Sequence, residues 1–219
     1  MKRIIIICSL LICATVANAQ NVETFDSNTF GWIESVGKDG SAIIVEGVMR
    51  LEGKNALDDI WNLTAGYSQV ITSCYAPFDP QKNFTFKCDA VAKKINDKGY
   101  FGLIFDYMDN YNYSAFYILK GDKNAKVIYH RLKDGKIVGC RSADLKLKEK
   151  KNAAFAFELR SSFDRVEFYC NDMKAMEVRY NPIQYCGIGL AVFGQQTVDF
   201  DNVQFIQIFA DCNWADKGV

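Results

Sequence analysis

The stretch "GYFGLIFDYMDNYNYSAFYIL", from Gly99 to Leu119, decides the fold of this chain. Two apolar, aromatic runs flank the short polar segment 108–112, where Asp and Asn side chains can satisfy free backbone donors. This arrangement predicts a β-hairpin with strands at 100–107 and 113–119. Successive strand residues point to opposite faces. One face of the first strand should therefore carry Phe101, Leu103, Phe105 and Tyr107, and the other Tyr100, Gly102, Ile104 and Asp106.

The same period of two runs through the rest of the chain. Apolar residues alternate with polar ones over 84–92 and 153–160, and the runs at 165–170 and 175–180 bracket the turn "NDMK". The run "YFGLIF" and the later "GIGLAVF" are apolar on both faces, as central covered strands would be. No long helix is predicted, although "ALDDIW" could form one helical turn. The sequence predicts an all-β fold, a two-sheet antiparallel β-sandwich.

The N-terminus indicates export. Lys2 and Arg3 precede an apolar run that is too short to span a bilayer, and Ala17-Asn18-Ala19 has the small-x-small pattern of a cleavage site. Residues 1–19 are therefore predicted to be a signal peptide, with a short membrane anchor or a lipid anchor at Cys13 as the alternatives. Residues 20–219 contain no linker and are predicted to form one domain, placed in the periplasm, at the cell surface or outside the cell.

Charge and hydropathy limit the partners. The 26 basic and 26 acidic residues cancel, so no overall field would attract nucleic acid. No later apolar run is long enough for a transmembrane segment in the mature chain. Charge and hydropathy therefore predict neither a nucleic-acid partner nor a membrane-spanning segment.

Six cysteines follow the signal, and an exported chain permits disulfides among them. They are Cys74, Cys88, Cys140, Cys170, Cys186 and Cys212. Cys88 and Cys170 continue the apolar faces of their strands, so buried free thiols compete with disulfides there.

Three segments resemble the concanavalin A-like lectin/glucanase superfamily: "ETFDSNTFGW" at 23–32, "GLIFDYMDNYNYSAFYI" at 102–118, and "GIGLAVFGQQTVDFDNVQF" at 187–205. Within the superfamily they are most similar to laminin-G-like jelly rolls and to the bacterial 3-keto-disaccharide hydrolase domain. The resemblance implies a jelly roll that binds glycans on its concave face or rim. It also implies that 24–26 pairs beside 198–205.

The resemblance carries over one metal site and excludes one chemistry. The superfamily's glucanases often hold a structural calcium near the last strand, and "DNVQF" places Asp201 at that position, with carbonyls of Gly47 or Gly53 to complete the shell. The family-16 glucanases cleave with E-x-D-x-x-E. This chain lacks that motif, and its sole histidine, His130, is expected to be an exposed strand residue rather than a catalytic base.

The expected function is therefore that of an exported, lectin-like domain that binds carbohydrate without hydrolysing it. A hydrolase of the glucanase or 3-keto-disaccharide type and a structural or interaction domain of the bacterial cell envelope are the alternatives. Sugars stack on aromatic rings while polar groups bind their hydroxyls. The ligand-binding candidates at or near turns are Trp61, Tyr107, Asp109, Tyr111, His130 and Arg131.

Overall fold

The computed structural model describes residues 21–56, 69–75, 79, 82–95, 99–120, 125–145, 154–162, 164–180, 183–185 and 187–207. These residues form strands and turns and contain no helix. Within these ranges, nothing helical is long and apolar enough to cross a membrane. Trp61, Cys186, Cys212, the predicted signal peptide and most of "ALDDIW" lie outside them.

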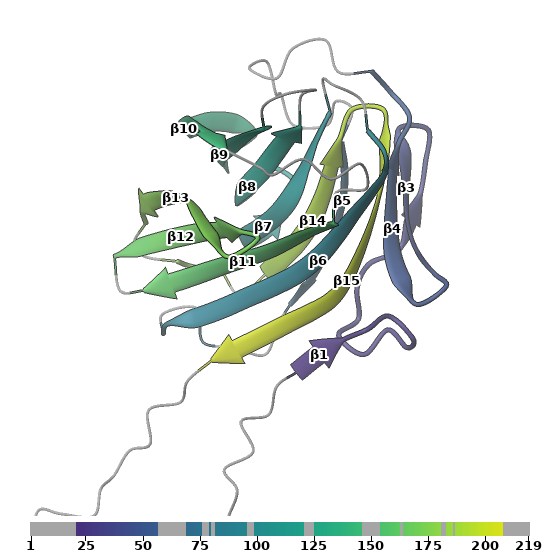
Figure 1. Cartoon of the computed structure of the whole chain (residues 1–219), viewed down its shortest axis with the longest axis horizontal. Coiled ribbons are helices and arrows are strands. Elements are labelled where there is room, and N and C mark those ends of the chain that lie inside the picture. Colours follow the sequence, from purple (N-terminus) through teal and green to yellow (C-terminus); the bar gives the residue numbers. More distant parts are fainter. Residues whose placement is uncertain are drawn as a thin grey trace, which may run out of the picture.

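Two antiparallel sheets make up the described fold, which confirms the predicted sandwich (Figure 1). The nine-stranded sheet runs in the order β13 (Met173–Arg179), β12 (Arg165–Cys170), β11 (Ala154–Ser162), β6 (Phe84–Lys94), β15 (Gln196–Gln207), β4 (Val48–Gly53), β3 (Gly40–Val45) and β2 (Ser35–Val36), with β1 (Asn21–Glu23) also paired to β15. The six-stranded sheet runs in the order β10 (Lys136–Leu145), β9 (Ala125–Lys133), β8 (Asn112–Lys120), β7 (Tyr100–Asp109), β14 (Gly187–Phe193) and β5 (Gln69–Tyr75).

The sequence pattern explains one hairpin, two interior strands and two turns of this fold. The predicted hairpin is β7 and β8, and β7 and β14 are neighbouring interior strands of the six-stranded sheet, as expected for strands that are apolar on both faces. The turns form where Asn and Asp precede β13 and β10. Asn171, Asp172 and Asp134 all have positive φ, a conformation that these residue types tolerate.

The first and last strands are adjacent, as the resemblance implied. Asn21 pairs with Phe205, and Glu23 pairs with Val203. The pairing strand therefore ends at Glu23, one residue before the predicted segment 24–26. The reason is that the Glu23 carboxylate accepts hydrogen bonds from the backbone N–H groups of Phe25 and Phe30, which turns the chain away from the sheet.

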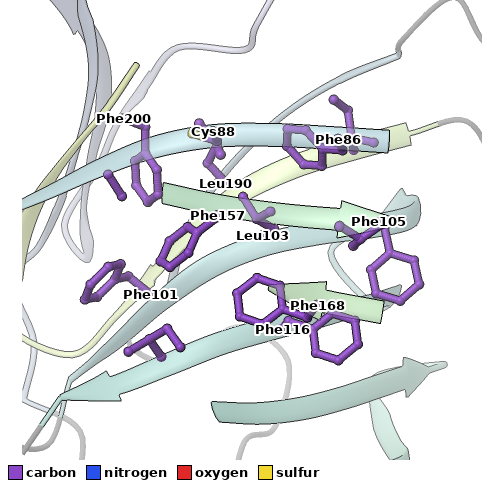
Figure 2. Packing of buried hydrophobic residues seen from close by; sticks show 14 of the residues in the cluster. Phe86, Cys88, Phe101, Leu103, Phe105, Phe116, Phe157, Phe168, Leu190 and Phe200 are labelled. Carbon is purple, nitrogen blue, oxygen red and sulfur yellow. The ribbon is translucent and has the colours of Figure 1, made fainter. Parts of the chain in front are cut away.

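The core lies between the two sheets and is built mainly of aromatic rings. Figure 2 shows Phe86 and Phe157 of the nine-stranded sheet near Phe101 and Phe105 of the six-stranded sheet. Phe116 stacks on Phe168 with ring centroids 5.2 Å apart, which joins the two layers. Such pairs add about 0.5–1.5 kcal/mol beyond the area that they bury.

Three of the cysteines, Cys74, Cys88 and Cys170, belong to this core. Cys88 and Cys170 are buried and carry free thiols, which confirms the burial predicted from the alternation. Burial raises the pKa of both thiols, so they remain protonated at neutral pH. Cys140 also carries a free thiol, but it is exposed on the edge strand β10.

Candidate functional site

A bulge in β7 determines which side chains reach the outer face of the six-stranded sheet. Asp106 has φ 51°, and the pairing of β7 shifts register next to it against both β8 and β14. Phe105 and Asp106 consequently both point toward the space between the sheets, and Tyr107 points outward. The prediction that Tyr107 shares a face with Phe105, and Asp106 with Ile104, was therefore wrong. Simple alternation cannot anticipate an extra residue.

Three tyrosines on this outer face form what we call the tyrosine platform: Tyr75, Tyr107 and Tyr113. Gly187 of β14 is paired with Tyr75 on one side and with Tyr107 on the other, so the two tyrosines flank a position without a side chain. A Cβ at Gly187 would lie 2.1 Å from the carbonyl oxygen of Tyr107. The rings of Tyr107 and Tyr113 have centroids 6.4 Å apart. Tyr75 is exposed, Tyr107 half-buried and Tyr113 buried.

Hydrogen bonds hold each hydroxyl of the tyrosine platform. Tyr75 donates to the carbonyl oxygen of Met108 (3.2 Å), Tyr107 to Asn110 Oδ1 (3.0 Å) and Tyr113 to Gln69 Oε1 (3.3 Å). Burial raises the pKa of Tyr107 and of Tyr113, so both remain neutral phenols. The site thus combines apolar ring faces with fixed polar groups, the combination that binds the faces and hydroxyls of small ligands.

The tip of the β7–β8 hairpin lies next to the tyrosine platform and is rigidly held. Asp109 Oδ1 accepts a hydrogen bond from the backbone N–H of Tyr111 (2.7 Å) and another from Asn112 Nδ2 (3.0 Å). The neighbouring β9–β10 turn contributes Gly135, whose N–H donates to the carbonyl oxygen of Tyr111 (2.9 Å). The Asp109 carboxylate therefore stabilises the turn. Hydrogen bonds to its N–H and its carbonyl oxygen hold the backbone of the exposed Tyr111 in place.

The structure thus brings three predicted ligand-binding residues together, Tyr107, Asp109 and Tyr111, on one hairpin. Sequence reasoning missed Tyr75 and Gln69, which come from β5. No signal in the sequence pairs β5 with β14, because the two strands are more than a hundred residues apart along the chain.

His130 does not belong to the exposed part of the site, and the expectation of an exposed histidine was wrong. Its side chain is fully buried on the same outer face, edge-on to Tyr117 with ring centroids 5.9 Å apart. Neither ring nitrogen has a hydrogen-bond partner among the described residues. Burial lowers the pKa of His130 to about 4, so the ring is neutral at physiological pH.

Arg131 faces the opposite way. Its guanidinium carbon lies 4.6 Å from the ring centroid of Tyr180, whose ring packs against Phe105 between the sheets. Because successive strand residues alternate, His130 and Arg131 cannot contribute to one surface. Arg131 therefore stabilises the core edge through a cation–π contact rather than extending the tyrosine platform.

A separate polar groove crosses the outer face of the nine-stranded sheet. Its volume is about 460 Å³, and its lining includes Asp89, Lys93, Asp199, Asp201 and Asn202. Asp199 is buried and accepts two hydrogen bonds from Arg50, at 2.7 and 2.9 Å, while Lys93 Nζ lies 3.5 Å from it. The charge of Asp199 is thus compensated within the groove.

Asp201, the predicted calcium ligand, lies in this polar groove directly opposite Asp89. Burial raises its pKa, and the charges of Asp89 and Asp26 act in the same direction. Gly47 is near, since a Cβ there would lie 3.1 Å from Asp26 Oδ1, whereas Gly53 pairs with Gln196 at the far end of β4 and cannot reach Asp201.

These carboxylates fit the oxygen preference of calcium. Across the described ranges, however, no group of three or more acidic, histidine or cysteine side chains is arranged to hold a metal ion. The calcium site at Asp201 stays a prediction.

Comparisons with known proteins identify the architecture. No protein-family model matches the chain, and no curated protein matches it by sequence. Among solved structures it is similar to the carbohydrate-binding module CBM66 from Bacillus subtilis, with 16% identity and a TM-score of 0.55 over 82% of this chain and 98% of that one. It is also similar to the Bacillus licheniformis β-glucanase (10% identity, TM-score 0.57, 86% and 98% coverage) and to the carbohydrate recognition domain of Emp47p (11%, 0.56, 87% and 96%). The resemblance read from the sequence is thus confirmed for the fold, which is the concanavalin A-like jelly roll.

Proposed function

We propose that this protein is an exported carbohydrate-binding domain, with residues 1–19 as its signal and 20–219 as one sandwich. The tyrosine platform carries this proposal. Tyr75 and Tyr107 offer ring faces on either side of Gly187. Asn110 places an amide group beside Tyr107, and Gln69 places one beside Tyr113. A sugar ring has an apolar C–H face and a rim of hydroxyls, which matches this arrangement.

The contacts of the acidic residues near the tyrosine platform support binding without cleavage. Hydrolysis of a glycoside requires two carboxyl groups that flank the bond. Asp106 turns inward and is bound to Tyr180, and Asp109 accepts hydrogen bonds within its own turn. The Asp106 carboxylate therefore does not face a sugar on the outer face, and the Asp109 carboxylate is engaged within its own turn.

A glycan array followed by calorimetry on the hits tests the proposal. Tyr75→Ala and Tyr107→Ala should each weaken binding roughly 3- to 10-fold, because each removes one aromatic contact. Tyr169→Ala is the matched control, since Tyr169 lies on the other sheet, where Arg160 stacks on it. Equal losses of glycan affinity in all three variants would contradict a site at the tyrosine platform. If the wild type binds no glycan on the array, an interaction domain would be favoured.

One observation favours hydrolysis as the second candidate. In the polar groove, the raised pKa of Asp201 and the adjacent Asp89 resemble an acid paired with a second carboxylate. A reducing-sugar assay on the bound glycans distinguishes the two functions. Product release that Asp201→Asn abolishes would establish the enzyme, whereas binding without product would support the lectin-like domain.

A further inference from the structure

The Asp106 carboxylate connects three parts of the chain that are distant in sequence. Its Oδ1 accepts hydrogen bonds from the backbone N–H groups of Gln184 and Tyr185, each 2.8 Å long. Its Oδ2 accepts a short hydrogen bond from the Tyr180 hydroxyl, which also contacts the Ser114 hydroxyl at 2.8 Å. Asp106 is buried, at 8% exposure, so these partners replace the water that the carboxylate loses.

The backbone at Asp106 also has an unusual conformation, a positive φ within a β-bulge. Its φ of 51° is uncommon outside glycine, and Asp and Asn are the other residue types that adopt it with modest strain. The bulge at this residue places Phe105 and Asp106 on the same side of the sheet. Tyr107 then faces outward, beside Tyr113. Without the extra residue, alternation would turn Tyr107 toward the core.

From these two observations we infer that Asp106 is the positioning residue of the tyrosine platform. Its side chain fixes the bulge from the core side, and the bulge aims Tyr107 at the ligand on the opposite side of the sheet. Asp106 touches no ligand itself. The inference rests on the proposed function only for the consequence on binding, because the orientation of Tyr107 can be measured without any glycan.

Three variants separate positioning from general stability. Asp106→Val removes the hydrogen-bond acceptors and adds a branched side chain that resists positive φ. Asp106→Asn keeps the tolerance for positive φ and one acceptor oxygen, so it should restore the wild-type arrangement. Glu46→Val is the matched control, because Glu46 has φ 53° at an exposed turn of the other sheet. It introduces the same backbone strain away from the tyrosine platform.

The first measurement is the NMR contact between the Tyr107 and Tyr113 rings, recorded on tyrosine-labelled protein that melts cooperatively. We expect the contact in the wild type, Asp106→Asn and Glu46→Val, and its loss in Asp106→Val. If folded Asp106→Val retains the contact, the inference is wrong. If Asp106→Val does not fold, Asp106→Ala takes its place, because it removes the same hydrogen-bond acceptors without adding a branched side chain, and the contact should be lost there too. Retention of the contact in folded Asp106→Ala would also overturn the inference.

The second measurement is affinity for the glycan that the array identifies. Asp106→Val should bind at least tenfold more weakly, and Asp106→Asn within threefold of the wild type. Unchanged affinity in Asp106→Val would overturn the link to binding. Absence of any glycan ligand for the wild type would refute the proposed function, and the ring contact would still decide the role of Asp106.

Discussion

Asp201 of β15 lies directly opposite Asp89 of β6, so two carboxylates occupy one cross-strand position on the outer face of the nine-stranded sheet. Like charges at such a position destabilise a sheet by roughly 0.2–1 kcal/mol. In chelator, Asp201→Asn should therefore be slightly more stable than the wild type. Millimolar calcium should raise the melting temperature of the wild type and leave that of Asp201→Asn unchanged.

Differential scanning fluorimetry with and without calcium checks this expectation. Glu52→Gln is the control, because Glu52 is an exposed carboxylate of β4 at the end remote from Asp201 and should leave the calcium response intact. If calcium leaves the melting temperature of the wild type unchanged, the predicted calcium site at Asp201 is wrong.

The stability of the fold should decline in mild acid because of His130. Its pKa of about 4 in the folded protein lies below the ordinary value of 6.5, so the unfolded chain binds the proton first as the pH falls. The free energy of unfolding should decrease from pH 6.5 down to about 4 and level off below that. The loss from this residue should be on the order of 3 kcal/mol.

Urea titrations at several pH values measure the slope of the free energy of unfolding against pH. His130→Phe should remove most of it, because phenylalanine fills a similar space and does not titrate. Since the chain has a single histidine, one NMR titration also gives its pKa directly. A histidine pKa near 6.5 in the folded protein would contradict the buried placement.

The thiols should react in two classes. Native protein should react quickly at the exposed Cys140, and denatured, unreduced protein should reveal at least Cys88 and Cys170 in addition. Ellman's reagent gives both numbers, and Cys140→Ser should remove one fast-reacting thiol from the native protein and leave Cys88 and Cys170 unchanged. Denatured protein without these thiols would mean that disulfides link the sandwich.

Substitution of Gly187 should damage both stability and the tyrosine platform. The new methyl group would lie 2.1 Å from the Tyr107 carbonyl oxygen and 3.1 Å from its Cβ, so β7 must move away from β14. Overpacking of this kind costs about 1–3 kcal/mol. Gly139→Ala is the control, since its nearest neighbour would be at an ordinary 3.5 Å. The melting temperature and the glycan affinity should both fall for Gly187→Ala and should stay unchanged for Gly139→Ala.

The sequence was sufficient to predict several strands and one hairpin but, apart from what the resemblance implied for the two ends, not the pairing of strands that lie far apart along the chain. Alternation in 84–92 and 165–170 is a local property, so it correctly predicted β6, β12 and the burial of their cysteines. The orientation of Tyr107 depends on amides of residues 184 and 185, almost eighty residues away. No local pattern contains that information.

The same limit explains the error at His130 and the Asp89–Asp201 pair that sequence reasoning missed. A histidine beside a turn looks exposed, but its burial depends on what lies over the sheet face, which strand periodicity cannot specify. Asp89 and Asp201 form a pair only because β6 and β15 keep one register from Val198 to Asp201, between two register shifts. Chemistry that depends on register has to be read from the structure.

The pairing of Asn21 with Phe205 has a mechanical consequence. The first strand enters and the last strand leaves the sheet at the same end, and the two strands run in opposite directions (Figure 1). A force that separates the two ends of the chain would therefore load the hydrogen bonds between β1 and β15 one after another, starting at this pair. The strands would unzip at low force, rather than resist together in shear, as strands pulled from opposite ends do.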